Sequence, residues 1–365
     1  MIMPVIEQEA KVTETTEETE VTEAAETPRR ARVLYLDVLR CYAIVFVVLL
    51  HAMVPFIANT QYFGSTSWLA MLAVNPFCRT AVAIFFMISG YLLLTDPLAD
   101  KIGSFYKKRL PRLIIPLLSW NIIYFIYNAY VLGKQEDYLS QLIDSGTAYH
   151  MWYVYTLIGI YLFAPFLKKI IDACSKKQVM GMFILLFMMT TVRPFINTVA
   201  PVYIHLFEPP LQGYFGFILL GYLLASVEFK RSQRILFYIG GVVGYAISVL
   251  LIYTRSTPEA LDFSINLGFS LPRYLLAAAI FVLAKQLFGK NDGTGRAAQT
   301  VTKCAGLIFG VYWVHVLVLE DLWERLFLDA IPIVEVIVRF ALALSISAVA
   351  AAIMTRIKPV KKHLL

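Results

Sequence analysis

The sequence has little cysteine. Its four cysteines, Cys41, Cys78, Cys174 and Cys304, are scattered over 365 residues, with neither the paired spacing of a disulfide framework nor the spacing of metal ligands. We therefore predict no disulfide framework and no metal site, and we interpret the cysteines as packing residues.

The sequence also lacks a hydrophilic stretch long enough for a soluble enzymatic domain. The longest such stretches are the N-terminal tail, 133–149, 254–269 and a glycine-rich segment at 289–298, which lacks the strand–helix context of a phosphate-binding loop. The composition is 59% hydrophobic with a mean hydropathy of +0.68, whereas soluble domains average about 45–50% apolar residues. These values place the chain in a membrane.

Residues 1–28 do not resemble a signal peptide, because they have no apolar core and are rich in glutamate and threonine. Such a segment buries too little apolar surface to offset its ordering entropy. We expect residues 1–30 to be an acidic disordered tail. A transmembrane domain should follow at 31–360, and a short basic cytoplasmic C-terminus at 361–365.

Apolar runs of about 20 residues predict an all-α fold, a polytopic bundle of about ten transmembrane helices. The spans are expected near 34–57, 72–95, 110–132, 151–171, 178–197, 211–228, 234–254, 270–289, 303–320 and 331–355. Lysine and arginine cluster in every second loop, and acidic residues occupy the others. The positive-inside rule then predicts both termini on the cytoplasmic side. It also explains the net charge of +7 without any nucleic-acid partner.

The first predicted span contains two ionisable side chains, Arg40 and His51, whose burial in a membrane costs free energy. Eleven residues make about three helical turns, so both point the same way, about 16 Å apart along the axis. Ionisable groups within a span mark a functional site by default. The alternative is that Arg40 reaches the headgroups and His51 is an interfacial histidine. Asp37, one turn before Arg40, can pair with it.

A dense basic cluster precedes the third predicted span, in the stretch FYKKRLPRLIIP. Arg109 and Arg112 are three residues apart and share a helix face. Planar guanidinium groups suit phosphate recognition. Topology alone accounts equally well for the neighbouring Lys107 and Lys108.

These residues resemble the acyltransferase-3 superfamily of bacterial membrane O-acyltransferases. The resemblance covers nearly the whole membrane region and rests on five elements in order. They are the Arg40–His51 spacing, the segment Phe85, Phe86, Ser89 and Gly90, the pair Arg109 and Arg112, the stretch HMWY from His150, and Tyr312 with His315. Ser89–Gly90 lacks the G-x-S-x-G elbow of a nucleophile, so close helix packing is the better interpretation.

The resemblance implies transfer of an acyl group, most often acetyl, from cytosolic acetyl-CoA or another acyl-CoA to a hydroxyl of a cell-envelope glycan or lipid-linked sugar. It implies a multi-pass protein of the bacterial inner membrane. His51 is then the catalytic residue, as general base or transient acyl carrier, and Arg40, Arg109 and Arg112 bind the donor.

Five further residues are candidates for the acceptor or the oxyanion. Arg79, His150 and Tyr153 are expected near the depth of His51 and are candidate oxyanion donors. Trp152 belongs to an aromatic stretch that either forms an interfacial belt or stacks on sugars. His315 either faces the same cavity or is a core histidine bonded to a backbone carbonyl.

Two other functions compete with acyl transfer. A transporter or flippase of a glycan or lipid precursor would use the same arginines as substrate sites. A non-catalytic partner in an envelope complex would depend on the acidic tail and not on His51. The sequence shows no repeat between its two halves, and its polar residues concentrate in the first four spans, which favours an enzyme.

Overall fold

The computed structural model describes residues 33–134, 137–144, 146–199, 214–266, 269–291, 293–326 and 330–365. The predicted acidic tail, residues 1–30, lies outside these ranges. Helices and no strands occur in the described ranges, which confirms the predicted all-α class. The helices are α1 (Leu34–Ile57), α2 (Thr66–Leu94), α3 (Ile102–Arg109), α4 (Pro111–Tyr130), α5 (Tyr138–Asp144), α6 (Trp152–Ala173), α7 (Lys176–Phe187), α8 (Arg193–Val199), α9 (Phe215–Ser226), α10 (Arg231–Arg255), α11 (Leu271–Phe288), α12 (Arg296–Ala305), α13 (Ile308–Arg325), α14 (Pro332–Arg356) and α15 (Lys358–Leu364). Shorter turns are η1 (Thr60–Tyr62), η2 (Pro97–Asp100), the π-helical η3 (Met188–Val192) and η4 (Ser264–Asn266).

Helices occur at each of the ten predicted spans. Within the described residues, eight helical stretches are long and apolar enough to cross a membrane. A ninth candidate is the pair α12–α13, which bends by 57° between Ala305 and Ile308. At the sixth predicted span the structure has α9, an apolar helix of only 12 residues. The chain is therefore a multi-pass membrane protein.

The second span begins six residues before its predicted start. Ser65 caps α2 by accepting a hydrogen bond from the Trp68 backbone N–H at 3.2 Å. The Trp68 indole N–H in turn donates to the carbonyl of Ile57 at the end of α1. Arg79 therefore lies about 20 Å along α2 from the helix start, rather than close to the end of the span.

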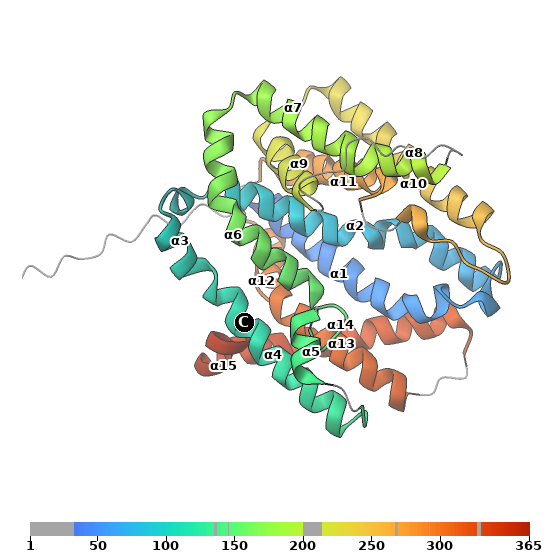
Figure 1. Ribbon diagram of the computed structural model, residues 1–365. Coiled ribbons are helices and arrows are strands. Elements are labelled where there is room, and N and C mark those ends of the chain that lie inside the picture. The colour runs from blue at the N-terminus through green and yellow to red at the C-terminus, as the bar shows by residue number, and fades with distance from the viewer. Residues whose placement is uncertain are drawn as a thin grey trace, which may run out of the picture. The chain divides into compact units, whose positions relative to one another are not determined.

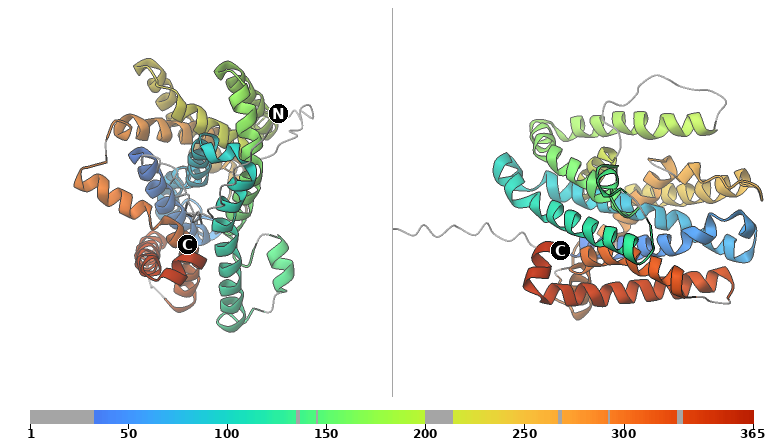
Figure 2. Two further views of the ribbon diagram at one scale, coloured as in Figure 1. Left: turned by 90° about the vertical axis from the view of Figure 1, so that its left-hand side faces the viewer. Right: turned by 60° about the horizontal axis from the view of Figure 1, so that its bottom comes forward.

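Helices α1 and α2 form the centre of the bundle. They pack against each other, α1 also contacts α11, α12, α13 and α14, and α2 also contacts α6, α9 and α11. In both ribbon figures the two helices lie between the α9–α11 group and the α13–α14 pair (Figures 1 and 2). The two helices that carry the predicted site residues of the first two spans are therefore central to the bundle.

The C-terminal residues are part of the bundle as well. Residues 361–364 belong to α15, which packs against α4. The Trp120 indole N–H donates to the carbonyl of Leu364 at 3.0 Å. This contact ties the basic C-terminal segment to the third span.

Glycine sets the closest helix approach. A Cβ atom added to Gly90 of α2 would lie 2.0 Å from the Ile218 carbonyl oxygen of α9, and one added to Gly221 of α9 would lie 2.0 Å from the Met87 oxygen. Backbones approach this closely only where neither helix carries a side chain. Gly90 is thus a packing residue, as the sequence favoured.

We expect Gly90→Ala to lower the free energy of unfolding by about 1–3 kcal/mol, because a methyl group forced against a backbone cannot be accommodated by rotating a side chain. Thermal unfolding of the purified protein in one detergent would measure the effect. Gly159→Ala is the matched control, since nothing lies within 4 Å of a Cβ there. Equal unfolding temperatures for both variants would contradict the packing role.

Candidate active site

A cavity of about 260 Å³ lies beside His51, near the last turns of α1. Helices α2, α6, α11 and α13 and the residues before α6 and α9 contribute its walls. Its lining comprises Val47, Leu50, His51, Cys78, Arg79, Val82, Phe85, His150, Trp152, Tyr153, Tyr214, Arg273 and Tyr312. The fold therefore gathers His51, Arg79, His150, Trp152 and Tyr153 around one space, although they are distant in sequence.

Three of the five histidines form a cluster at this cavity. The His315 ring centroid lies 5.3 Å from that of His51 and 5.2 Å from that of His150. His150 is buried, and neither of its ring nitrogens has a hydrogen-bond partner among the described residues. Buried polar atoms without a partner cost free energy. His150 can therefore offer a donor or an acceptor to a ligand.

His315 has the hydrogen bond of a core histidine and also lies beside His51. Its Nδ1 is 2.7 Å from the carbonyl oxygen of Tyr312 and 3.1 Å from that of Val311. Carbonyl oxygens only accept, so Nδ1 carries the proton in the neutral ring and Nε2 keeps its lone pair. Nε2 is buried and has no hydrogen-bond partner within the described part of the chain. The backbone of α13 thus fixes the tautomer of a histidine that touches the cavity cluster.

Aromatic side chains form much of the cavity wall. Trp152 stacks on Tyr214 with centroids 5.6 Å apart, and Tyr153 packs edge-on against Tyr312 at 5.8 Å. Tyr149 lies 5.0 Å from the His51 ring. Tyr155 points elsewhere, because its hydroxyl donates to the Leu142 carbonyl. Tyr214 also stacks on Phe86 with centroids 4.1 Å apart, so its ring is held between two aromatic neighbours in the wall.

Arg79 of α2 and Arg273 of α11 bring two cations into the same cavity. They lie close enough to repel each other, and Arg79 is close enough to act on His51 electrostatically. Arg273, Tyr214 and Tyr312 were not predicted as cavity residues. Arg273 carried the same signal as Arg79, a cation in an apolar run, but only the fold shows that the two side chains share one space.

The predicted donor-binding arginines gather at a different place. Arg40 of α1, Arg109 of α3 and Arg112 of α4 all lie within electrostatic range of the Tyr161 hydroxyl on α6. Arg40 also acts on Tyr153, two turns earlier on α6, which lines the His51 cavity. Three predicted residues from three helices therefore act electrostatically on the same α6 residue, Tyr161.

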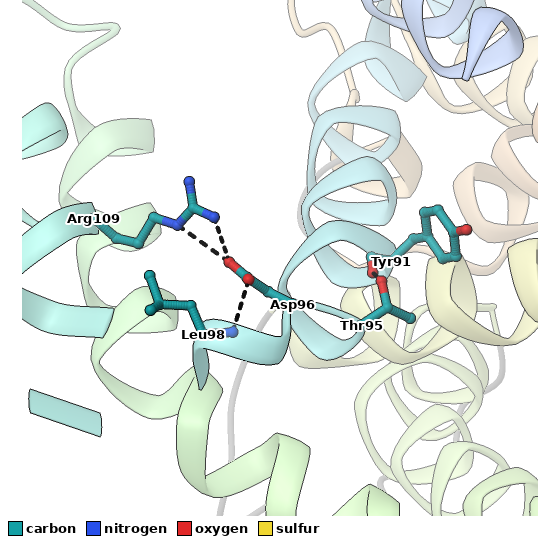
Figure 3. Close-up of polar contacts among 5 residues, drawn as sticks. All are labelled: Tyr91, Thr95, Asp96, Leu98 and Arg109. Carbon is teal, nitrogen blue, oxygen red and sulfur yellow. Dashed lines mark hydrogen bonds and ion pairs between the residues drawn. The ribbon is translucent and has the colours of Figure 1, made fainter. Parts of the chain in front are cut away.

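Carboxylates hold two of these arginines. Asp37, fully buried, pairs with Arg40 at 2.5 Å and accepts a bond from Thr302 of α12 at 3.3 Å. Asp96 pairs with Arg109 through two guanidinium nitrogens and also accepts from the Leu98 N–H (Figure 3). Arg112 is exposed and forms no ion pair within the described part of the chain. Arg112 is therefore the arginine most available to a ligand.

A second cavity, of about 450 Å³, lies between α7, α9, α10 and α11. Gln233 and Tyr274 are the polar residues of its lining, and it contains none of the predicted site residues. Among the described residues no group of three or more His, Cys, Asp or Glu side chains is placed to hold a metal ion. The side chains suited to acid–base chemistry thus gather at the His51 cavity.

A multi-pass helical bundle with a cavity lined by histidine, arginine and aromatic side chains defines a membrane protein with a candidate site inside the bundle. The chain belongs to the acyltransferase-3 family, since the family model, described as an acyltransferase domain, matches residues 33–356. It is therefore a membrane acyltransferase.

The chain is also similar to a serine/alanine racemase of Enterococcus gallinarum, with 26% identity over 204 residues. The alignment covers 50% of this chain, and the chain spans only 29% of the racemase's length. No solved structure matches the chain significantly.

The two carboxylate pairs should differ in their contribution to stability. Removing one partner of a fully buried pair costs about 3–5 kcal/mol. Because Arg40 is 27% exposed, we expect about 2–3 kcal/mol for Asp37→Asn. Arg109 is 33% exposed, and Asp96→Asn should cost about 1 kcal/mol. Thermal unfolding of both variants in one detergent would test this order, and a lower unfolding temperature for Asp96→Asn would contradict it.

Proposed function

We propose that the protein transfers a short acyl group, acetyl in the first instance, from cytosolic acyl-CoA to a hydroxyl of a cell-envelope glycan or lipid-linked sugar. The observation that carries this proposal is the cavity that joins His51 to aromatic walls and to unpartnered polar groups, in a chain of the acyltransferase-3 family. Aromatic faces suit sugar rings, and an imidazole suits proton transfer from a hydroxyl.

His51 would act in one of two ways. As general base, it takes the proton of the acceptor hydroxyl while that oxygen bonds to the thioester carbonyl carbon. The carbon–sulfur bond then breaks, and the coenzyme thiolate receives the proton. As nucleophile, a ring nitrogen of His51 bonds to the acyl carbon and expels the thiolate, and the acceptor hydroxyl takes the acyl group in a second step.

The developing oxyanion needs a hydrogen-bond donor in either route. Arg79, His150 and Tyr153 line the same cavity as His51. Each can donate a hydrogen bond, and together they surround the space in which an acyl carbonyl would lie.

The donor's phosphates fit the arginine cluster around Tyr161. Their negative charge needs several cations, and guanidinium groups bind phosphate oxygens in pairs. Arg112 is free to do so, whereas Arg40 and Arg109 are held in place by Asp37 and Asp96. The coenzyme arm would then lie along α6 from Tyr161 toward Tyr153, with its thioester beside His51. The positive-inside rule assigns this cluster to the cytoplasmic side.

We expect His51→Ala to lower acyl transfer by at least about 100-fold, because loss of a general base costs roughly 10²–10⁴ in rate. Protein in nanodiscs would be given radiolabelled acetyl-CoA, an envelope glycan extract and, because of the racemase similarity, serine as a second hydroxyl acceptor. Coenzyme release and label transfer are both measured. His363→Ala, an exposed histidine on α15, is the matched control.

Retained transfer in His51→Ala would exclude His51 as the catalytic residue. Label that stays on wild-type protein after a quench, and is absent from His51→Ala, would identify the acyl-histidine route. Absence of coenzyme binding in the wild type would favour the transporter.

Arg112→Ala should mainly raise the donor KM, by about 10-fold or more, since a charge-assisted bond contributes about 1.5–3 kcal/mol. Arg231→Ala removes an exposed arginine at the start of α10 and controls for general surface charge. Donor KM and kcat are measured by coenzyme release at saturating acceptor. An unchanged KM in Arg112→Ala would refute the assignment of Arg112 to the donor.

A further inference from the structure

The larger cavity, of about 450 Å³, has no part in the proposed acyl transfer. Helix α7 packs against α9, α9 against α11 and α11 against α10, and these four helices bound the cavity. Its volume lies within the roughly 300–1,000 Å³ typical of small-molecule sites. Nine of its eleven lining residues are apolar, and four of them are the phenylalanines Phe183, Phe187, Phe229 and Phe237. Such a lining suits a hydrocarbon ligand.

The cavity is open on the side that faces the bilayer. Leu236 of α10 lines it and is nevertheless 68% exposed. Helix α7 begins one stretch that is long and apolar enough to cross a membrane, Lys176–Val199, and α10 forms another, Arg231–Arg255. An exposed leucine within such a stretch faces lipid tails. A ligand can therefore enter the cavity from the membrane itself.

The cavity lies in the first half of both membrane stretches. On α10 its lining begins at Gln233, the third residue of the helix, and reaches Gly240, about 10 Å further along. On α7, Phe183 and Phe187 lie about 10–17 Å from the first residue, Lys176. Both helices start at loops rich in lysine and arginine, which the positive-inside rule assigns to the cytoplasmic side. The cavity is therefore expected in the cytoplasmic leaflet.

A lysine precedes the cavity lining on each of these two helices. Lys176 comes seven residues before Phe183 and eleven before Phe187, so the three lie within about 20° of one direction around α7. Lys230 stands one turn before Gln233, whose side-chain oxygen accepts a hydrogen bond from the Lys230 backbone N–H at 2.9 Å. Both lysines are exposed, and neither forms an ion pair within the described ranges. Two cations are thus available where the apolar lining ends.

We infer that this cavity binds an anionic phospholipid of the cytoplasmic leaflet, with an acyl chain against the phenylalanines and the phosphate held by Lys176 and Lys230. Basic pockets between membrane helices on the cytoplasmic side bind anionic headgroups, and the apolar lining takes the chain. A zwitterionic phospholipid offers the same chain without the net charge. Such binding requires no acyl transfer, so it can be tested whether or not the proposed reaction occurs.

The first test compares two lipids that differ only in the headgroup. Protein freed of lipid in detergent is titrated with dioleoyl phosphatidylglycerol or dioleoyl phosphatidylcholine, and native mass spectrometry measures the bound fraction. We expect phosphatidylglycerol to reach half-occupancy at a concentration about tenfold lower or less, because each nearby lysine favours an anionic headgroup. Equal half-occupancy concentrations for the two lipids would overturn the inference.

The second test removes the two charges. Lys176→Gln combined with Lys230→Gln should abolish most of the preference for phosphatidylglycerol. The matched control combines Lys177→Gln with Arg231→Gln, which removes two exposed cations one residue further along the same helices, about 100° around each axis. The control should keep the preference of the wild type. An equal loss in both double variants would indicate attraction to the basic surface as a whole and would contradict the site.

The third test fills the cavity. A Cβ atom at Gly240 would lie 3.6 Å from the nearest atom, the Leu275 Cδ2, so a side chain there leaves the helix contact in place. Gly240→Met should raise the half-occupancy concentration of both lipids by about fivefold or more, because methylene groups of the bound chain lose their contacts. Gly159→Met is the control, at an exposed position of α6 with no atom within 4 Å of a Cβ.

Unchanged lipid binding in Gly240→Met would refute the cavity as the place of the chain. A lipid-free dimer that this variant disrupts would assign the cavity to contact with a second copy of the chain, and would likewise overturn the inference.

Discussion

The cost of placing a cation inside an apolar bundle governs the arrangement of this protein. Three cations of the helices have identified partners: Asp37 for Arg40, the end of α13 for the buried Arg339, and the carbonyls of Leu224, Ala225 and Val227 for Lys285. Each contact joins two segments, so the charges help to fix the helix packing. Arg79 lines the cavity and has no such partner among the described residues.

The cavity depends on how closely α2 approaches α9. Gly90 and Gly221 let the two backbones touch, and Tyr214, just before α9, packs against Phe86 of α2 at 4.1 Å. Arg79 lies three turns before Gly90 on α2. Arg273 reaches the same cavity because its helix, α11, also packs against α2. A side chain at Gly90 would therefore alter the cavity as well as the helix contact. The close contact between α2 and α9 therefore affects both the stability of the fold and the geometry of the cavity.

Much of the fold was predictable from the sequence, because a membrane leaves few choices. Apolar runs of sufficient length gave the helical class and the first span, 34–57, to the residue. The start of α2 was missed because Asn75, Pro76 and Arg79 interrupt the apolar run, whereas Ser65 and Trp68 set the true beginning. The bend between α12 and α13 also left no signal in hydropathy.

Helix periodicity predicted that Arg40 and His51 share a face, but the meeting of Arg79 with Arg273 depends on contacts between helices more than 190 residues apart. No local pattern encodes such a contact, which is why Arg273 was missed.

The size and position of the cavity also constrain the acyl group. Helix α1 is continuous from Arg40 to His51, so the helix fixes the distance between the two, and in the proposed reaction the donor would have to span it. Beside His51, a cavity of about 260 Å³ would have to hold the acyl group and part of the acceptor in the proposed reaction. That volume lies below the roughly 300–1,000 Å³ typical of small-molecule sites. In the proposed reaction a long fatty chain would need space that the aromatic walls occupy, which favours a short acyl group. In the proposed reaction the helix would set the distance that the donor spans, and the aromatic walls would limit the length of the acyl group.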